Sequence, residues 1–546
     1  MNLINIKIFF EKLNKFRFSC ICGILLLTLI ALFSGQNTIP PIDRDEARFA
    51  QASRQMIQTN DFVNIKFQDE LRAKKPVGIY WIQALSANVF GETKISSFRF
   101  PSIIFSLISL IFIGLLTRLI FPFYQSLIVV LFFGSSFVFI GEAHLAKTDA
   151  TLLALICVQQ YYLLKLILKK GSLAQIKFWY PLVIWIAFAF GILVKGPLSI
   201  VILSLTTISF CFVKKDFSLL KSLNPLLGII VSSIIILPWI IAINEATQGL
   251  FIEKAFNDDF FSKLKSGQEG HGAWPGMHLI MLSITLWPLA MIIPGSIIFF
   301  LNNKSNLVVQ FLICWIIPFW FLIEIVPTKL IHYSLPILPA ITILSLGSIF
   351  HSQSQIQNIK NNIFHKLILT LSIIFGFGGL ILGSSILYFS FKFNYNEDST
   401  ILIGSILVFI ITIIIFSLSL ILITQFKKVP TLLKKSVYNI PLLIIAFACM
   451  FNIINYQFIF PKLDYLYPSK LIIKKIQTIK PDAVASAGYH EPSLVFLFNG
   501  EIMLSSPQEV AIFMAEGNKN IGLVEAQALE EFLDKSKEIN LSVKTE

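Results

Sequence analysis

The feature that most restricts the fold of this chain is its series of apolar segments, each about as long as a membrane is thick. Residues 19–35, 126–141, 226–243 and 401–423 are four examples. A helix of about 20 apolar residues crosses a hydrocarbon core of about 30 Å. Hydrophobic residues make up 55% of the 546 positions and charged residues only 14%, which excludes an ordinary soluble domain. The sequence predicts an all-α polytopic membrane bundle with about thirteen transmembrane helices.

The distribution of basic residues predicts how this bundle is oriented. The formal net charge of +13 would suit a nucleic-acid partner, but in a polytopic protein Lys and Arg gather in cytoplasmic loops. With a cytoplasmic N-terminus, alternate connections are basic, and the intervening ones carry only isolated lysines. We therefore predict no nucleic-acid partner and an external C-terminal segment. The basic clusters are Lys7, Lys12, Lys15 and Arg17; Lys165, Lys169, Lys170 and Lys177; Lys214, Lys215 and Lys221; and Lys427, Lys428, Lys434 and Lys435.

Three polar regions interrupt the apolar pattern on the predicted external face. Two are loops at residues 35–100 and 244–275 within a transmembrane domain of residues 1–460, and the third is a small soluble α/β domain of residues 461–546. Long loops above a membrane bundle are frequent locations of functional sites. In the third region the pattern predicts strands at 482–489 and 493–500 and helices at 506–517 and 526–537.

The first external loop carries a dense charged cluster directly after the first apolar segment. The stretch "IPPIDRDEARFAQASRQM", residues 39–56, contains Asp45, Glu46 and Arg48. Asp43 is a plausible N-cap with Glu46 three residues later, which predicts a surface helix. A second surface helix is expected over 77–91, which includes Tyr80. Helix capping alone would explain the acidic residues, so the cluster is a candidate site only in combination with others.

Basic residues on the same external side provide that combination. Arg72 and Lys75 lie in "RAKKPVGIYW", where contact with lipid headgroups is the alternative to substrate binding. Lys195 interrupts an apolar run, and an ionisable residue in a membrane segment suggests function, with snorkelling to the surface as the alternative. Lys329 and Tyr333 lie in "VPTKLIHYSLPILPA" at another external helix entrance.

Further ionisable residues flank the same face. His144 and Asp149 lie in "GEAHLAKTDATLL", where capping of the following helix would explain Asp149. Glycines surround His271 in the second loop, and Glu491 follows a predicted strand; both are candidate metal ligands or ordinary loop residues. Carboxylates and lysines from at least four segments thus meet at one membrane face. That pattern predicts a site for an anionic, lipid-soluble substrate.

The ordered motifs resemble a known family. "DRDEARFAQASRQM", "KKPVGIYW", "FRFPS", "KTDA", "KGP" and "PTKLIHYSLPILPA" are similar in order and spacing to the integral-membrane glycosyltransferases of the GT-C class. Within that class the resemblance is to the family of the lipid A aminoarabinose transferase and the protein mannosyltransferases. It covers residues 16–350 and, more faintly, the C-terminal domain.

The resemblance implies a GT-C bundle beneath an external cap, in a bacterial inner membrane with a periplasmic C-terminal domain. It implies inverting transfer of a sugar from a polyprenyl-phosphate carrier to a lipid A-like glycolipid or a protein. Asp45 matches the family's essential acidic residue, Lys75 its phosphate-contacting lysine, and Asp149 a second acidic residue at the cavity. A zinc ion in one relative makes His271 and Glu491 candidate ligands, although two ligands make a poor zinc site.

From these matches we predict the following roles. Asp45 and Asp149 are the catalytic candidates, with Asp45 as general base for a hydroxyl acceptor. The candidates for donor phosphate are Lys75, Arg72, Lys195 and Lys329. Other residues expected at the substrate cavity are Glu46, Arg48, Tyr80, His144 and Tyr333.

Two other functions fit part of the pattern. A transporter or flippase for lipid-linked sugars would place ionisable residues along a path through the membrane, whereas here they lie at one face. An envelope polysaccharide ligase would also use a basic external loop, but the order of motifs favours sugar transfer. The sequence leaves the sugar, the acceptor and the oligomeric state open.

Overall fold

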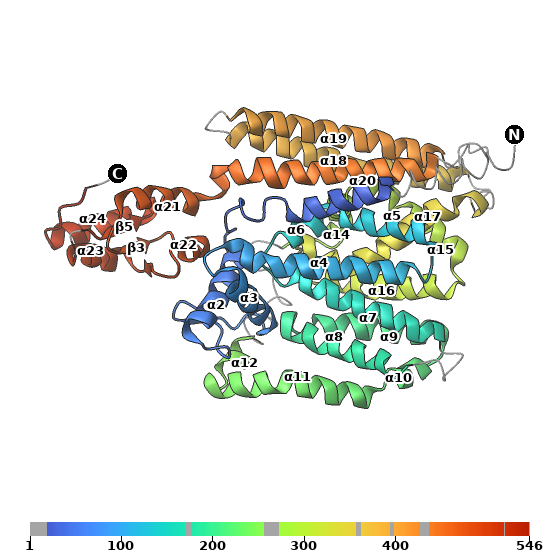
Figure 1. Cartoon of the computed structure of the whole chain (residues 1–546), viewed down its shortest axis with the longest axis horizontal. Helices are drawn as coiled ribbons and strands as arrows, with labels where there is room; N and C mark the ends of the chain where they lie inside the picture. The colour runs from blue at the N-terminus through green and yellow to red at the C-terminus, as the bar shows by residue number, and fades with distance from the viewer. Residues whose placement is uncertain are drawn as a thin grey trace.

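A bundle of apolar helices with a small domain at one end forms this protein (Figure 1). The structure is a computed structural model, and it describes residues 19–169, 177–255, 272–355, 362–393, 398–425, 436–517 and 519–544. In the figure, the surface helices α2 and α3 and the C-terminal domain lie at the left end of the bundle. The two polar regions that are far apart in the sequence therefore meet at one end.

Eight helices in the described part of the chain are long and apolar enough to cross a membrane. α5 and α6 pass the same test together but are bent by 65° at their junction. Three shorter apolar helices of 10–17 residues accompany them, so the prediction of thirteen crossings is not confirmed. The eight segments are Ile95–Thr117 (α4), Asp149–Lys169 (α7), Pro225–Ala246 (α11), Leu307–Ile325 (α16), Ile331–Phe350 (η4, Ile331–Ile337, and α17, Leu338–Gln355), Lys366–Phe393 (in α18, Asn362–Phe393), Ser399–Thr424 (in α19, Ser399–Gln425) and Asn439–Lys462 (from α20, Ser436–Ile454).

The remaining helices of the bundle are short or broken. Several end at or next to Gly or Pro. Gly permits backbone conformations that end a helix, and Pro has no N–H group to continue the helical hydrogen bonds. Gly196, with φ of 67°, ends α8 and lets the chain return into α9 after Pro197. The bounds are Ser19–Phe33, Phe123–Gly134 (α5), Phe137–Ala143 (α6), Trp179–Lys195 (α8), Leu198–Lys214 (α9), Ser218–Ser222 (α10), Leu250–Lys254 (α12), Met277–Thr285 (α14), Ala290–Ile292 (η3) and Gly295–Asn303 (α15).

The helices pack in a sequence of neighbours that places α7 near the centre. α7 packs against α4 on one side and α8 on the other, and α11 covers α8 from outside. α7 is buried along most of its length, whereas the apolar residues of α11 are largely exposed. Exposed apolar surface of this extent is expected where a helix faces lipid. The helix that carries Asp149 at its start is therefore an interior element of the bundle.

The first polar region, residues 35–100, forms two helices and a hairpin. α2 spans Asp45–Thr59, α3 spans Gly78–Phe90, and β1 (Lys66–Phe67) pairs antiparallel with β2 (Glu70–Leu71) between them. Both predicted surface helices are present, but the predicted N-cap is wrong. Arg44 occupies the cap position of α2 without a side-chain cap bond, and the Asp43 carboxylate instead accepts a hydrogen bond from the backbone N–H of Ser493. A contact with the C-terminal domain has replaced the local cap.

The C-terminal domain is a three-stranded parallel sheet with helices. The strand order is β4-β3-β5, so the chain crosses from one side of β3 to the other. The strand at 482–489 and the two later helices are confirmed, but 493–500 is wrong as a strand because its apolar residues begin a short helix. A short apolar run does not distinguish a buried strand from a buried helix. The elements are α21 (Pro468–Ile479), β3 (Val484–Ala487), α22 (Pro492–Leu497), β4 (Met503–Leu504), α23 (Pro507–Ala515), β5 (Ile521–Val524) and α24 (Leu529–Glu538).

Direct contacts attach this domain to the first loop. The Arg54 guanidinium on α2 donates to the Phe496 carbonyl oxygen at 2.8 Å and lies 3.9 Å from the centre of the Phe496 ring. The Gln68 side chain, at the tip of the hairpin, donates to the Ile502 carbonyl oxygen at 2.8 Å. α2, the hairpin and the C-terminal domain therefore form a single cap.

Candidate functional site

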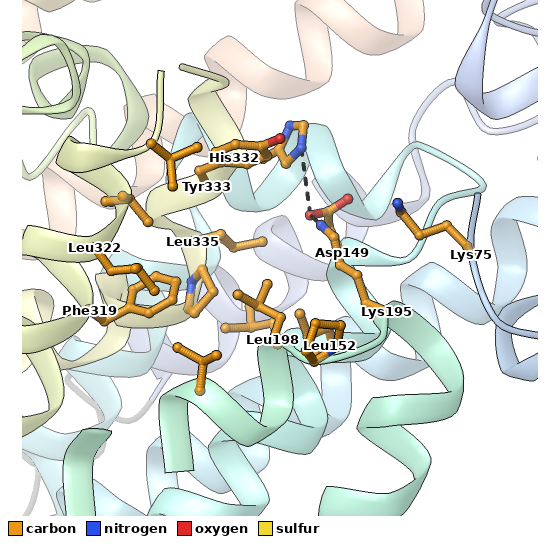
Figure 2. A pocket seen from close by; sticks show the side chains of 16 residues that line it. Lys75, Asp149, Leu152, Lys195, Leu198, Phe319, Leu322, His332, Tyr333 and Leu335 are labelled. Atoms are coloured by element: carbon orange, nitrogen blue, oxygen red, sulfur yellow. Dashed lines mark hydrogen bonds and ion pairs between the residues drawn. The ribbon is translucent and has the colours of Figure 1, made fainter. Parts of the chain in front are cut away.

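A cavity of about 280 Å³ lies where α7 begins, beside α8, α9 and α16 (Figure 2). One part of its wall is ionic and polar, and the rest is almost entirely apolar. The ionic and polar side chains are Lys75, Asp149, Lys195, His332 and Tyr333. The apolar ones are Leu152, Leu153, Pro197, Leu198, Val201, Phe319, Leu322, Ile323, Val326, Leu335 and Pro336.

Asp149 is at the centre of the ionic part. Its Oδ1 is 2.5 Å from the Lys195 Nζ and 3.9 Å from the His332 Nε2. Only 7% of the Asp149 side chain is exposed. Figure 2 shows Lys75 approaching from the opposite side, with its amino group pointing toward this carboxylate. The predicted meeting of Lys75, Asp149 and Lys195 is therefore present in the structure.

Glu142 extends this ionic group and is not among the residues predicted from the sequence. Its carboxylate lies 3.3 Å from the Lys147 Nζ and 3.7 Å from the His332 Nδ1. His332 thus lies between two carboxylates, Glu142 on α6 and Asp149 on α7. An acidic residue within the apolar run 126–143 was the available signal, because a buried carboxylate in such a segment needs partners.

Asp45 lies at the exposed edge of the same group. Its side chain is 66% exposed, and its Oδ1 is 3.9 Å from Nη2 of the buried Arg72. Burial lowers the pKa of Lys147, but neighbouring carboxylates outweigh burial and hold that pKa above its ordinary value. Asp45 is one of these carboxylates, and it also acts on His332. The first loop therefore brings Asp45 into electrostatic range of the cavity while leaving it open to solvent.

Glu46, the neighbour of Asp45, is buried and fully engaged. Both of its oxygens accept from Arg99, at 2.8 Å each. Ala146 and Ile42 donate their backbone N–H groups to the same carboxylate, at 2.8 and 2.9 Å. Glu46 thus joins the first loop to α4 and to the turn that precedes Asp149. In this structure it holds the site together and does not line the cavity.

Several other predicted residues have structural partners. Arg72 Nε donates to the Tyr80 hydroxyl at 3.1 Å, and both side chains are buried behind Asp45. The ring nitrogens of His144 are each 2.7 Å from a backbone carbonyl oxygen, and the ring stacks on Tyr456. Arg48 lies farther out, in a separate cleft beside the C-terminal domain. Among these four, the described contacts place only Arg72 directly against a catalytic candidate.

Lys329 is placed differently from the prediction. Its Nζ donates to three carbonyl oxygens at the end of α16, those of Ile323, Glu324 and Val326, at 2.7, 2.7 and 2.8 Å. A cation at a helix C-terminus stabilises the unpaired carbonyls and the negative end of the helix dipole. Lys329 is not among the described residues that line the cavity. Its ammonium group is used to end a helix.

Of the two residues predicted to bind metal, the structure describes only Glu491. His271 lies outside the described residues. Burial and the nearby Asp43 raise the pKa of Glu491, while Arg44 and Arg48 act in the opposite sense. Across the described ranges, no group of three or more His, Cys, Asp or Glu residues is placed to hold an ion. A zinc site with three or more such ligands would therefore need residues outside these ranges.

Comparison with known proteins gives matches in sequence and in structure. Residues 74–241 match the family model described as dolichyl-phosphate-mannose-protein mannosyltransferase. Two relatives are undecaprenyl phosphate-alpha-4-amino-4-deoxy-L-arabinose arabinosyl transferases. The Proteus mirabilis protein is 25% identical over 333 residues, covering 58% of this chain and 58% of its own length. The Serratia proteamaculans protein is 24% identical over 373 residues, covering 66% and 65%. The chain thus spans less than two thirds of the length of these relatives.

The structural match extends over almost the whole chain. ArnT from Cupriavidus metallidurans, in the apo state and bound to undecaprenyl phosphate, matches with a TM-score of 0.68 and 16% identity. The match covers 95% of this chain and 90% or 91% of the other. At this identity it establishes the fold, which includes the bundle and the cap. The chain is thus similar in sequence to these arabinosyl transferases and, over residues 74–241, to the mannosyltransferase family model, and it shares the fold of ArnT from Cupriavidus metallidurans.

Proposed function

We propose that the protein transfers a sugar from a polyprenyl-phosphate carrier to a cell-envelope acceptor, at the membrane face that carries α2, α3 and the C-terminal domain. The observation that supports the proposal is the cavity at the start of α7, whose wall is ionic and polar in one part and apolar in the rest. A polyprenyl phosphate needs an apolar channel and cationic groups side by side, and the cavity provides both. Relatives named as undecaprenyl phosphate-alpha-4-amino-4-deoxy-L-arabinose arabinosyl transferases support the same donor class.

Lys75 and Lys195 are the residues suited to the departing phosphate. The bond between the sugar C1 and the phosphate oxygen breaks, and its electron pair stays on that oxygen. Cations placed at this oxygen stabilise the developing charge most where water is scarce. The Asp149 carboxylate, 2.5 Å from the Lys195 Nζ, holds this lysine at the cavity. Asp149 acts in this scheme by positioning Lys195 and orienting the sugar.

Asp45 is suited to the acceptor side. Attack at C1 opposite the leaving phosphate inverts the anomeric centre, and a hydroxyl acceptor must lose its proton as the new C1–O bond forms. The solvent-exposed Asp45 carboxylate is the group we assign to take that proton. A phosphate acceptor is already anionic and needs no base. In that case Asp45 positions the reacting groups and takes no proton.

Transport and oligosaccharide ligation are less well supported. A transporter would use ionisable residues along the middle of a path through the bundle. Here the charged residues of the cavity gather at the end of α7 that faces the cap. A ligase would share the basic external loop, but the similar proteins are named as arabinosyl transferases.

The proposal includes the membrane in which the protein lies and its orientation there. The protein lies in a bacterial inner membrane, with a cytoplasmic N-terminus and a periplasmic C-terminal domain. The basic clusters in alternate connections support this orientation. Accessibility of a cysteine introduced at Lys537 on α24 to a membrane-impermeant reagent, in whole cells with a permeable outer membrane, tests it. Labelling that occurs only after inner-membrane lysis would reverse the assignment.

Zinc also remains a proposal, with His271 and Glu491 as the ligands suggested by family resemblance. No step above depends on it. Elemental analysis of the purified protein tests it directly: one zinc per chain, reduced by His271→Ala but not by His490→Ala, would support the site. Equal zinc contents in the wild type and His271→Ala would remove His271 from any metal site.

The experiment for the proposed function measures release of carrier phosphate. Purified protein is incubated with a panel of polyprenyl-phosphate sugars, and turnover is followed for the wild type and Asp45→Asn. We expect Asp45→Asn to abolish turnover to a hydroxyl acceptor while the thermal unfolding temperature is unchanged. Asp534→Asn, an equally conservative change on exposed α24, is the matched control. Near-normal turnover in Asp45→Asn would remove Asp45 from the mechanism.

A further inference from the structure

His332 lies in the wall of the catalytic cavity and has no role in the mechanism proposed above. Its Nδ1 is 3.7 Å from the Glu142 Oε1, and its Nε2 is 3.9 Å from the Asp149 Oδ1. We infer that His332 takes up a proton as the carrier phosphate leaves the sugar, and that the imidazolium stabilises the second negative charge of that phosphate. The inference rests on the proposed function and adds a residue to its donor side.

Each of the two carboxylates beside His332 already has a lysine partner. The Lys147 Nζ is 3.3 Å from the Glu142 carboxylate, and the Lys195 Nζ is 2.5 Å from the Asp149 carboxylate. These four charges cancel, so a proton on His332 would add a net charge to a cavity whose wall is mostly apolar. A net charge in such surroundings is costly. His332 is therefore neutral in the ligand-free protein.

The other helices beside His332 leave this balance unchanged. The helical turn that carries it, η4, packs against α14, α16 and α17 as well as α6 and α7. On α14 and α16, His278 lies 3.7 Å from the Glu324 carboxylate, which is also 3.6 Å from the Lys329 Nζ. The carboxylate and the lysine of this group form a pair. On α17, residues 338–350 include no ionisable side chain.

The charges of the first loop are matched in the same way. Asp45 acts electrostatically on His332, and its Oδ1 is 3.9 Å from Nη2 of Arg72. Lys75 lines the cavity and is assigned to the donor phosphate. The donor is a phosphate diester with one negative charge, for which this lysine supplies a cation. Binding of the donor therefore requires no proton on His332.

The reaction then changes the charge of the phosphate. When the bond between C1 and the phosphate oxygen breaks, the electron pair stays on the oxygen and the diester becomes a monoester. The second ionisation of a phosphate monoester has a pKa of about 6, so the carrier gains a negative charge at neutral pH. The lysines of the cavity are already charged. Among the described residues that line it, only His332 can gain a positive charge in this pH range.

The protons balance over the cycle. His332 takes its proton from the solvent and returns it when the carrier leaves. A hydroxyl acceptor releases one proton to Asp45, which passes it to the solvent. With a phosphate acceptor no proton is released on the acceptor side, and the uptake by His332 on the carrier side is the same.

The position of the imidazole ring suits this role. The Nε2 of His332 and the Nζ of Lys195 approach the same oxygen of Asp149, so one phosphate group can contact both. Figure 2 shows the ring at the ionic end of the cavity, next to Asp149. Both distances from the ring to carboxylates exceed the length of a hydrogen bond, so these carboxylates act on His332 through charge. Glu142, at the other ring nitrogen, is a positioning residue that favours the imidazolium.

Calorimetry on the full-length protein in detergent tests the inference. A short-chain polyprenyl phosphate is titrated at about pH 8, where the free monoester is a dianion, in buffers of different ionisation enthalpy. We expect the wild type to take up about one proton per phosphate bound, and about none per polyprenyl-phosphate sugar. His332→Gln should take up none with either ligand. His490→Gln, which replaces an exposed histidine of the C-terminal domain, is the control and should behave as the wild type.

Kinetics give a second readout that a purely structural role would not change. His332→Gln should lower kcat about tenfold or more with little change in KM for the donor, because the diester needs no imidazolium. In the wild type, kcat should fall at alkaline pH as His332 loses its proton. Glu142→Gln should move this fall to lower pH, since the imidazolium loses a favourable carboxylate. Turnover is compared at temperatures where each variant is folded.

Four results would overturn the inference. They are no proton uptake by the wild type, equal uptake with the monoester and the diester, the same uptake in His332→Gln, and wild-type kcat in a folded His332→Gln. The first two need no variant. A wild type that takes up the proton through His332 but cleaves no polyprenyl-phosphate sugar supports the role of His332 and contradicts the proposed function.

Discussion

The buried pair of Glu46 and Arg99 allows a quantitative prediction about how the site is assembled. The two side chains are 1% exposed each and make two hydrogen bonds of 2.8 Å. Arg99 also donates to the carbonyl oxygens of Gln36, Ile39 and Pro40. Glu46→Gln keeps the shape but leaves the guanidinium without its counter-ion. Breaking a buried pair in this way costs about 3–5 kcal/mol.

The assay is thermal unfolding of the purified protein in detergent, with denaturant titration where unfolding is reversible. For a chain of this length, we expect Glu46→Gln to lower the unfolding temperature by roughly 3–4 °C. Arg99→Met should be destabilising by itself, and the double variant Glu46→Gln/Arg99→Met should lose less than the sum of the two. Glu538→Gln, which breaks an exposed pair with Lys535, is the matched control with no measurable change.

The same variant tests the link between this pair and the site. Glu46 also accepts from the Ala146 backbone N–H, so it holds the turn that carries Lys147 and leads into Asp149. Turnover per folded molecule should therefore fall in Glu46→Gln, even at temperatures where the variant is folded. A Glu46→Gln protein with wild-type unfolding temperature and turnover would refute the reasoning that this pair supports the cavity.

Three further predictions concern Asp149, Lys75 and Lys329. Asp149→Asn should lower both turnover and the unfolding temperature, because it leaves Lys195 in the cavity wall without its carboxylate. Adding Lys195→Met should restore the unfolding temperature but not turnover. Recovery of turnover in the double variant would contradict the assigned roles. Lys75→Met should raise the KM for a polyprenyl-phosphate sugar about tenfold or more with little change in unfolding temperature. Lys329→Met should instead lower the unfolding temperature, since three helix-end carbonyls lose a charged donor. A raised KM in Lys329→Met together with a lowered unfolding temperature in Lys75→Met would place the donor phosphate at Lys329.

The membrane class and the selection of Lys195 could be predicted from local pattern, whereas Lys75 and Asp149 were assigned to the same site by the resemblance to a family. Apolar length predicts membrane helices, and a lysine in an apolar segment needs a carboxylate or a ligand. The roles of Glu142 and Lys329 could not be predicted in this way. Whether a buried ion faces a cavity or the end of a neighbouring helix depends on the rotation and depth of that helix, which apolar periodicity leaves open.

The errors at Asp43 and at 493–500 have a related cause. Asp43 has the sequence position of an N-cap, but its carboxylate bonds to the backbone of a residue 450 positions later. The apolar run at 493–500 begins as helix α22, which packs against α2. In both places a long-range contact between the first loop and the C-terminal domain determined the local structure, because tertiary contacts are of the same magnitude as local preferences.

The sequence by itself determined that the chain crosses a membrane repeatedly and that charged residues from distant segments gather at one face. The physical reason is that the hydrocarbon core admits only helices that make their backbone hydrogen bonds internally, and ions that are paired. The tertiary structure alone decided which ions pair with which. It placed Glu46 in a supporting pair with Arg99, Lys329 at a helix end, and Asp45 at the exposed edge of the cavity, beside Arg72. These outcomes depend on distances of a few ångströms between segments that are far apart in the chain, and the energy of each ion depends on those distances and on its burial.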